Sequence, residues 1–160
     1  MHEYVRQGDF SIVYYLITFG YDINQKNNIT QSTPLIDAIT YGQDTIAYYL
    51  IKNGADINIR DKDGFTALMT AINYGNLAIA SILILYGADV NIADNDGITA
   101  LMIASSMGFA NIVCQLIQHG ANVFITNRRG ETALTNAMQE NHTEVISILQ
   151  NAMRSPVVHL

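Results

Sequence analysis

Two acidic turns are the stretches of this sequence whose residue types are best suited to chemistry. They read DKDG at 61–64 and DNDG at 94–97. Calcium loops of the EF-hand type place carboxylates in this way, but they also need a carboxylate at the first loop position and a glutamate at the twelfth. Both stretches lack these ligands, because the required positions hold Ile59 and Thr70 in one and Ile92 and Ile103 in the other. We therefore interpret them as tight turns, in which Asp or Asn precedes glycine, and predict no metal site.

The histidines and the single cysteine also lack a catalytic arrangement. His2, His119, His142 and His159 are scattered, and none has a potential ligand four residues away on a plausible helix. His119 directly precedes a glycine, a position where histidine commonly caps a helix C-terminus. Cys114 has no neighbouring cation in the sequence that would stabilise a thiolate, so we expect an inert, buried side chain. The sequence predicts no catalytic residue and no cofactor, and we expect that the protein is not an enzyme.

Composition narrows the function further. The chain has 160 residues, is 49% hydrophobic and 14% charged, and carries a net charge of −6. Nucleic-acid-binding domains usually show a basic stripe, which this acidic chain lacks, so we expect no nucleic-acid partner. No apolar run reaches the ~18 residues that a membrane span requires, so no membrane association is expected. One unpaired cysteine suits a reducing compartment and favours a cytoplasmic location, or the cytoplasm of a host cell if the protein is a microbial effector.

The elements that carry these residues recur with a period of 33 residues. NGADINIRDKDGFTALM at 53–69 returns as YGADVNIADNDGITALM at 86–102. The recurring positions include Gly54, Gly87 and Gly120, Thr66, Thr99 and Thr132, and Leu68, Leu101 and Leu134. A unit of this length cannot bury its own apolar face, whereas stacked neighbours bury it for one another. The constant residues therefore build the stack, and the variable residues face solvent.

Each unit predicts a helix, a turn, a second helix and an extended finger. The threonines at 33, 66, 99 and 132 occupy helix N-cap positions, and Pro34 follows the first of them at a position that needs no backbone N–H. Apolar residues then recur at helical spacing. We predict that Gly42, Gly75 and Gly108 end the first helix of their units, each glycine having a left-handed backbone conformation, and Asn141 replaces this glycine in the last unit. Asparagine is the next residue to tolerate that conformation.

The period, the G-x-T-A-L-M-x-A pattern and the GADVN segment resemble the ankyrin repeat over residues 5 to about 151. The resemblance implies an all-α ankyrin-repeat solenoid of stacked helix-turn-helix units with β-hairpin finger loops. We expect an N-terminal half or capping repeat, three repeats, a C-terminal capping repeat and a tail. Their predicted boundaries are 1–24, 25–58, 59–91, 92–124, 125–153 and 154–160.

One position departs from the family pattern. The family commonly reads Thr-Pro-Leu-His, and its histidine links loops by hydrogen bonds. This position holds Ile36, Met69, Met102 and Thr135. We therefore expect a stack that depends more on apolar contact and is slightly softer.

The resemblance implies a protein partner that docks on the finger tips and the exposed side of the first helices. Carried onto this sequence, the predicted partner-binding residues are Tyr41, Lys62, Asp63, Phe65, Asn73, Tyr74, Asn95, Asp96, Ile98, Ser106, Met107, Arg128 and Arg129. Two columns contain large apolar residues at positions expected to face solvent, which is typical of binding patches. The first column, before the glycine that ends the first helix, contains Tyr41, Tyr74, Met107 and Glu140. The second column, on the fingers, contains Ser32, Phe65, Ile98 and Glu131. The alternative is that these side chains fold against the finger bases.

The sequence thus predicts a monomeric, non-catalytic protein–protein interaction module. The alternative is a regulatory or inhibitory protein that binds one specific enzyme or host protein. In the family, asparagines in an L-x-x-x-x-x-D-[IV]-N pattern can be hydroxylated, and the pattern here ends at Asn24, Asn58 and Asn91. The simpler interpretation is that these asparagines bond across the finger bases.

Overall fold

The computed structural model describes residues 1–154, which fold into helices joined by turns. The chain divides into two compact units, Met1–Ala88 (the first unit) and Asp89–Leu160 (the second unit). The predicted tail at 154–160 lies outside the described residues except for Arg154, which ends the last helix.

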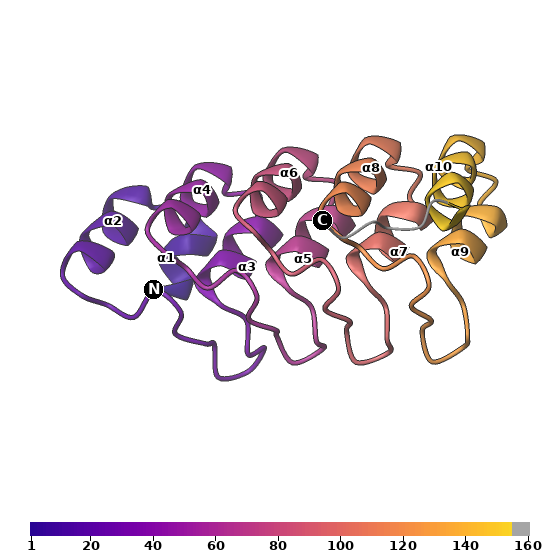
Figure 1. Cartoon of the computed structure of the whole chain (residues 1–160). Helices are drawn as coiled ribbons and strands as arrows, with labels where there is room; N and C mark the ends of the chain where they lie inside the picture. Colours follow the sequence, from indigo (N-terminus) through magenta and orange to yellow (C-terminus); the bar gives the residue numbers. More distant parts are fainter. Residues whose placement is uncertain (155–160) are drawn as a thin grey trace. The chain divides into compact units, whose positions relative to one another are not determined.

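The first unit contains three helix pairs. They are α1 (His2–Gln7) with α2 (Phe10–Thr18), α3 (Pro34–Thr40) with α4 (Asp44–Lys52), and α5 (Ala67–Asn73) with α6 (Leu77–Leu85). The first helices of the pairs pack in one row, α1 on α3 and α3 on α5, and the second helices pack in another, α2 on α4 and α4 on α6. Figure 1 shows the two rows of this unit one above the other, with the finger loops extending from the row of first helices. We call α1, α3 and α5 the inner helices and the others the outer helices.

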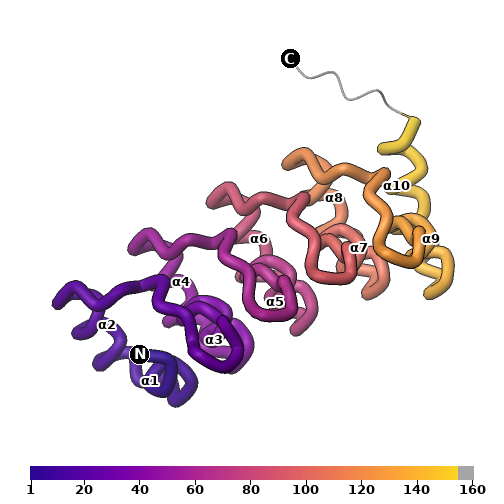
Figure 2. Tube along the Cα trace, turned by 90° about the horizontal axis from the view of Figure 1, so that it is seen from below, coloured from indigo at the N-terminus to yellow at the C-terminus, as the bar shows by residue number. Residues whose placement is uncertain are grey.

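The second unit repeats this arrangement with two pairs, α7 (Ala100–Ser106) with α8 (Ala110–Gln118) and α9 (Ala133–Gln139) with α10 (Thr143–Arg154). Here α7 packs on α9 and α8 packs on α10. Within each unit the consecutive pairs follow one another side by side, as Figure 2 shows from below. All ten helices of the described residues therefore belong to helix-turn-helix pairs, as the sequence predicts.

The helix ends confirm the predicted capping chemistry. The side chains of Thr33, Thr66, Thr99 and Thr132 each accept a hydrogen bond from the backbone N–H three residues later. This bond satisfies one of the free donors of the first turn. At the other end Asn141 has φ of 59°, in the left-handed region that the glycines of the other pairs occupy. The predicted replacement of glycine by asparagine is therefore confirmed.

The core of each unit lies between its inner and outer helices. Leu35, Leu50, Leu68 and Leu83 are at most 1% exposed in the first unit, and Leu101, Leu116 and Leu149 fill the same role in the second. Burying a leucine side chain contributes about 1.5–3 kcal/mol, and within each unit the helices of one pair pack on those of the next. Packing between pairs therefore holds the short helices in place, since isolated helices of this length are marginal in water.

The fingers are held by side chains that cap their turns. Asn27, Asp61, Asp94 and Asn127 each accept hydrogen bonds from two backbone N–H groups further along the same finger. The expected β-hairpin character is limited to hydrogen bonds across each finger, such as Asp61 N to Phe65 O at 2.9 Å, and to one isolated bridge between Ala93 and Thr99. Asp61 and Asp94 thus act as turn residues, which confirms the interpretation of DKDG and DNDG as tight turns.

The N-terminal segment, predicted as a half or capping repeat, begins with a short inner helix. It contains both helices of a pair, although α1 has 6 residues where the other inner helices have 7.

Within the described part of the chain, none of the helices combines the length and the apolar character that crossing a membrane demands.

Candidate functional site

A cavity of about 390 Å³ opens on the first unit between the inner helices and the fingers. Its walls come from α3 and α5 with their C-cap tyrosines, from Arg6 of α1 and from the finger residues of two successive repeats. We call it the first cavity. Six of the predicted partner-binding residues line it, namely Tyr41, Lys62, Asp63, Phe65, Asn73 and Tyr74.

The two tyrosines of the first cavity are exposed although they are large and mostly apolar. Tyr41 is 50% exposed and Tyr74 is 60% exposed, and each is the C-cap residue of its inner helix. Phe65, on the finger, is half-buried. Aromatic side chains that line a hollow in this way offer contact area at low cost in side-chain entropy.

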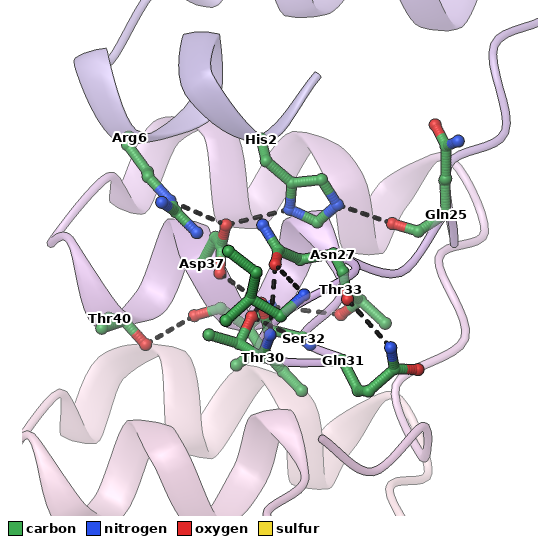
Figure 3. A network of polar contacts seen from close by, with 12 residues as sticks. His2, Arg6, Gln25, Asn27, Thr30, Gln31, Ser32, Thr33, Asp37 and Thr40 are labelled. Carbon is green, nitrogen blue, oxygen red and sulfur yellow. Dashed lines mark hydrogen bonds and ion pairs between the residues drawn. The ribbon is translucent and has the colours of Figure 1, made fainter. Parts of the chain in front are cut away.

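A buried polar network forms the α1 side of the first cavity (Figure 3). The Asp37 carboxylate on α3 accepts a hydrogen bond from Ser32 Oγ at 2.6 Å and one from Arg6 Nε at 3.1 Å. Its second oxygen also lies 2.9 Å from His2 Nδ1, while His2 Nε2 lies 2.7 Å from the backbone oxygen of Gln25. Helix α1, helix α3 and the first finger are therefore tied together by one carboxylate.

The network holds Asp37 in its charged form. Burial on its own raises the pKa of Asp37, but hydrogen bonds from His2 and Ser32 and the charges of Arg6 and His2 outweigh it, so that the pKa lies below the ordinary value of 3.8. Both partners of the His2 ring are acceptors, so both contacts are hydrogen bonds only when both ring nitrogens carry protons. The Asp37 side chain is only 6% exposed, so these donors replace its lost water.

Arg6 also covers the ring of Tyr41, with its Cζ atom 5.4 Å from the ring centroid. This distance is within the range of a cation–π interaction. The guanidinium is thus held between a carboxylate and an aromatic ring, on the wall of the first cavity.

The second unit has a smaller cavity of about 170 Å³, lined by Asp96, Ile98, Asn127, Arg128 and Arg129. Four of these are predicted partner-binding residues. Arg128 Nη1 lies 3.5 Å from Asp96 Oδ1, and both side chains are more than 70% exposed. A pair this exposed contributes little to stability, which leaves both groups available to a partner.

The remaining predicted residues lie outside both cavities. They are Asn95 and Met107, which are exposed, and Ser106, which is half-buried. Met107 is 40% exposed at the C-terminal end of α7, the place that Tyr41 and Tyr74 occupy on their helices.

One member of the predicted solvent-facing columns is misplaced. Ser32 is 4% exposed, because its hydroxyl is turned inward to the Asp37 carboxylate. Nothing in the repeat pattern brings Arg6, Asp37 and His2 together as a group. A charged residue at 37, where the next repeats have Thr70 and Ile103, was the available signal that a buried polar contact lies there.

The other residues considered for chemistry lie outside both cavities. His119 Nδ1 lies 2.9 Å from the backbone oxygen of Gln115 at the end of α8, as expected for a cap. Cys114 is half-buried, whereas a buried side chain was expected. The Asn24 side chain accepts a hydrogen bond from Asp56 N at 2.9 Å, and Asn91 bonds to Asn122 N and Gly120 O. These two asparagines therefore bond across the finger bases. Among the described residues, no three His, Cys, Asp or Glu side chains are grouped in a way that could hold a metal ion.

Comparison with known families agrees with this architecture. A family model described as ankyrin repeats, in three copies, matches residues 1–94 and residues 74–156. No curated protein matches the chain.

Proposed function

The chain belongs to the ankyrin repeat family, whose members are generally protein–protein interaction modules and typically non-catalytic, and on that premise we propose that it binds a protein partner through its inner helices and fingers. It acts as a non-catalytic module that presents a preformed surface. Preformed surfaces lose less conformational entropy on association than flexible ones.

The first cavity is the observation that supports this proposal most directly. It is hollow, it is lined by exposed aromatic side chains and by polar groups, and it contains six of the residues that the sequence predicts for partner binding. Binding sites typically combine an apolar hollow with a small number of polar groups that point into it. The smaller cavity of the second unit, with Asp96, Ile98, Arg128 and Arg129, is a second candidate binding site.

The test is a double substitution of Phe65→Glu with Tyr74→Glu. Two charges in the first cavity are expected to weaken partner capture at least ~10-fold, because each carboxylate would lose its hydration against apolar partner atoms. Both side chains are partly exposed, so the variant is expected to remain folded. Capture is measured by pull-down from cell lysate with quantification by mass spectrometry.

The matched control is Tyr15→Glu with Phe19→Glu. These aromatic side chains are 58% and 70% exposed at the C-terminal end of α2, an outer helix. The centroids of their rings lie 4.2 Å apart. The control is expected to capture the same partner as the unmodified chain. If the control loses the partner while the Phe65 and Tyr74 variant retains it, the binding surface lies on the outer helices and the proposal is wrong.

The identity of the partner, a regulatory or inhibitory role, a monomeric state and a cytoplasmic location remain predictions. Identification of the captured partner, sedimentation of the purified chain and fractionation of the source cells test them in turn.

A further inference from the structure

Arg6 places one guanidinium group on the wall of the first cavity, between a carboxylate and an aromatic ring. Arg6 places its Nε 3.1 Å from the Asp37 carboxylate and its Cζ 5.4 Å from the centre of the Tyr41 ring. A planar cation that bonds to a carboxylate and stacks on a ring satisfies both groups at once.

The next repeat has the ring but not the cation. Tyr74 lies 33 residues after Tyr41 and likewise caps the end of its inner helix. Arg6 lies two residues before Gly8, and the matching position before Gly42 holds Thr40, whose hydroxyl donates to the backbone oxygen of Ile36. Threonine is short and uncharged. Within the described residues no cation covers the Tyr74 ring, which is 60% exposed.

The charged side chains that line the first cavity differ in whether they already have an interaction partner. Arg6 is bonded to Asp37, and Lys62 already has an interaction partner. Asp63, by contrast, is exposed, and within the described part of the chain its carboxylate makes no hydrogen bond or ion pair. The groups still open to a ligand are thus an aromatic ring and a carboxylate, which together favour a cation.

We propose that the first cavity takes a basic segment of the protein partner, an arginine of which stacks on Tyr74 and pairs with Asp63. Arginine fits better than lysine, because its planar guanidinium can stack and donate to a carboxylate with the same group, whereas an ammonium is a compact, strongly hydrated charge. The net charge of −6 on the whole chain favours the approach of such a segment. This inference rests on the proposed function, since it specifies the partner chemistry of the same surface.

The experiment is a selection of random 12-residue peptides, displayed on phage, against the full chain, followed by affinity measurements on synthetic peptides. Selected peptides are expected to be enriched in arginine. Tyr74→Leu and Asp63→Asn are each expected to weaken their binding by about 3- to 10-fold, the range that a cation–π contact or an ion pair accounts for. Replacement of the peptide arginine by lysine is expected to weaken binding in the same range, and replacement by glutamate to abolish it.

Two control variants match these changes outside the first cavity. Tyr86→Leu removes another exposed helix-capping tyrosine, 47% exposed at the end of α6. Asp56→Asn changes an exposed carboxylate whose Oδ1 accepts from Asn58 N, a bond that asparagine can keep. Both are expected to bind the peptides as the unmodified chain does, and urea unfolding verifies that all four variants are folded.

The outcomes separate this inference from the proposed function. Peptides without arginine enrichment, whose binding is lost in the Phe65→Glu, Tyr74→Glu variant, overturn the arginine anchor and leave the proposed function standing. Peptides that bind this double variant as well as the unmodified chain overturn both. The absence of any selected peptide also counts against both.

Discussion

At the scale of single residues, Asp37 shows how a charge is accommodated in a stack built from apolar contact. The family position that commonly bears a loop-bridging histidine holds Ile36 in this repeat, and Ile36 is buried. The next residue provides a polar link of a different kind, since Asp37 bonds to α1 and to the first finger. A polar bridge is therefore present in the first unit, but it starts from another side chain.

This link makes stability depend on pH in a defined direction. The pKa of folded Asp37 lies below its ordinary value, so the charged carboxylate stabilises the fold above about pH 4 and loses this effect as the pH falls through the lower folded pKa. Asp37→Asn is expected to lower the free energy of unfolding by about 1–3 kcal/mol near neutral pH, because the Arg6 guanidinium loses its charged acceptor and an amide N–H replaces one of the two carboxylate oxygens that accept bonds. Urea unfolding between about pH 7 and pH 2 is expected to show this difference shrinking at the acid end.

Asp63→Asn is the control, because Asp63 is exposed and its carboxylate has no partner among the described residues. It is expected to leave the stability nearly unchanged at every pH. A deficit of Asp37→Asn that stays constant down to the lowest pH would show that the charge of Asp37 does not contribute.

At the scale of elements, two neighbouring fingers of the second unit approach so closely that Gly97 is required for two reasons. Gly97 has φ of +83°, and a Cβ added there would lie 3.0 Å from the Cα atom of Asn127 on the next finger of the second unit. Gly130 holds the same place 33 residues later, with φ of +76°, and a Cβ there would meet nothing within 4 Å. The two positions share the backbone conformation and differ in the neighbour.

Alanine substitutions at Gly97 and Gly130 are expected to lower the free energy of unfolding by different amounts, and the difference measures the contact between the fingers. Both Gly97→Ala and Gly130→Ala incur a left-handed backbone cost of about 1 kcal/mol. Gly97→Ala is expected to cost about 1–3 kcal/mol more, because backbone must shift to relieve the overlap. Thermal or urea unfolding of the two variants provides the comparison. Equal losses would mean that the fingers move apart without cost and do not support one another.

Most of the elements could be predicted from the sequence, because their causes are local and repeated. Thr66 and Thr99 fix the helix starts through their own hydroxyls, and Asn141 replaces a glycine only where the left-handed conformation is needed. The contacts of Ser32 could not be predicted in this way. Its inward rotation depends on Asp37, which in turn depends on Arg6, 31 residues earlier, and such pairing is set by packing between repeats.

The candidate site likewise has features that the sequence could predict and features that it could not. The exposed tyrosines at 41 and 74 follow from the period alone, since each ends an inner helix. That Thr40 holds the position of Arg6 in the following repeat gains its meaning only when the Arg6 side chain is seen over Tyr41. A repeat-based prediction therefore identifies the columns of the surface but not which members are already covered.

At the scale of the whole molecule, the proposed function places partner binding on the inner surface and not on the outer surface. Each unit has an inner surface of first helices and fingers and an outer surface of second helices. Exposed aromatic side chains occur on both surfaces of the first unit, with Tyr41 and Tyr74 on the inner and Tyr15 and Phe19 on the outer one. Exposure alone does not decide between them, whereas the first cavity lies on the inner side.

Hydrogen–deuterium exchange of the chain, with and without the partner obtained by pull-down, tests whether the partner binds the inner surface of the first unit. We expect slower exchange in the finger at 59–66 and in α5, with little change in the outer helices α2, α4 and α6. Protection confined to those outer helices, with the finger at 59–66 exchanging as in the free chain, would contradict it.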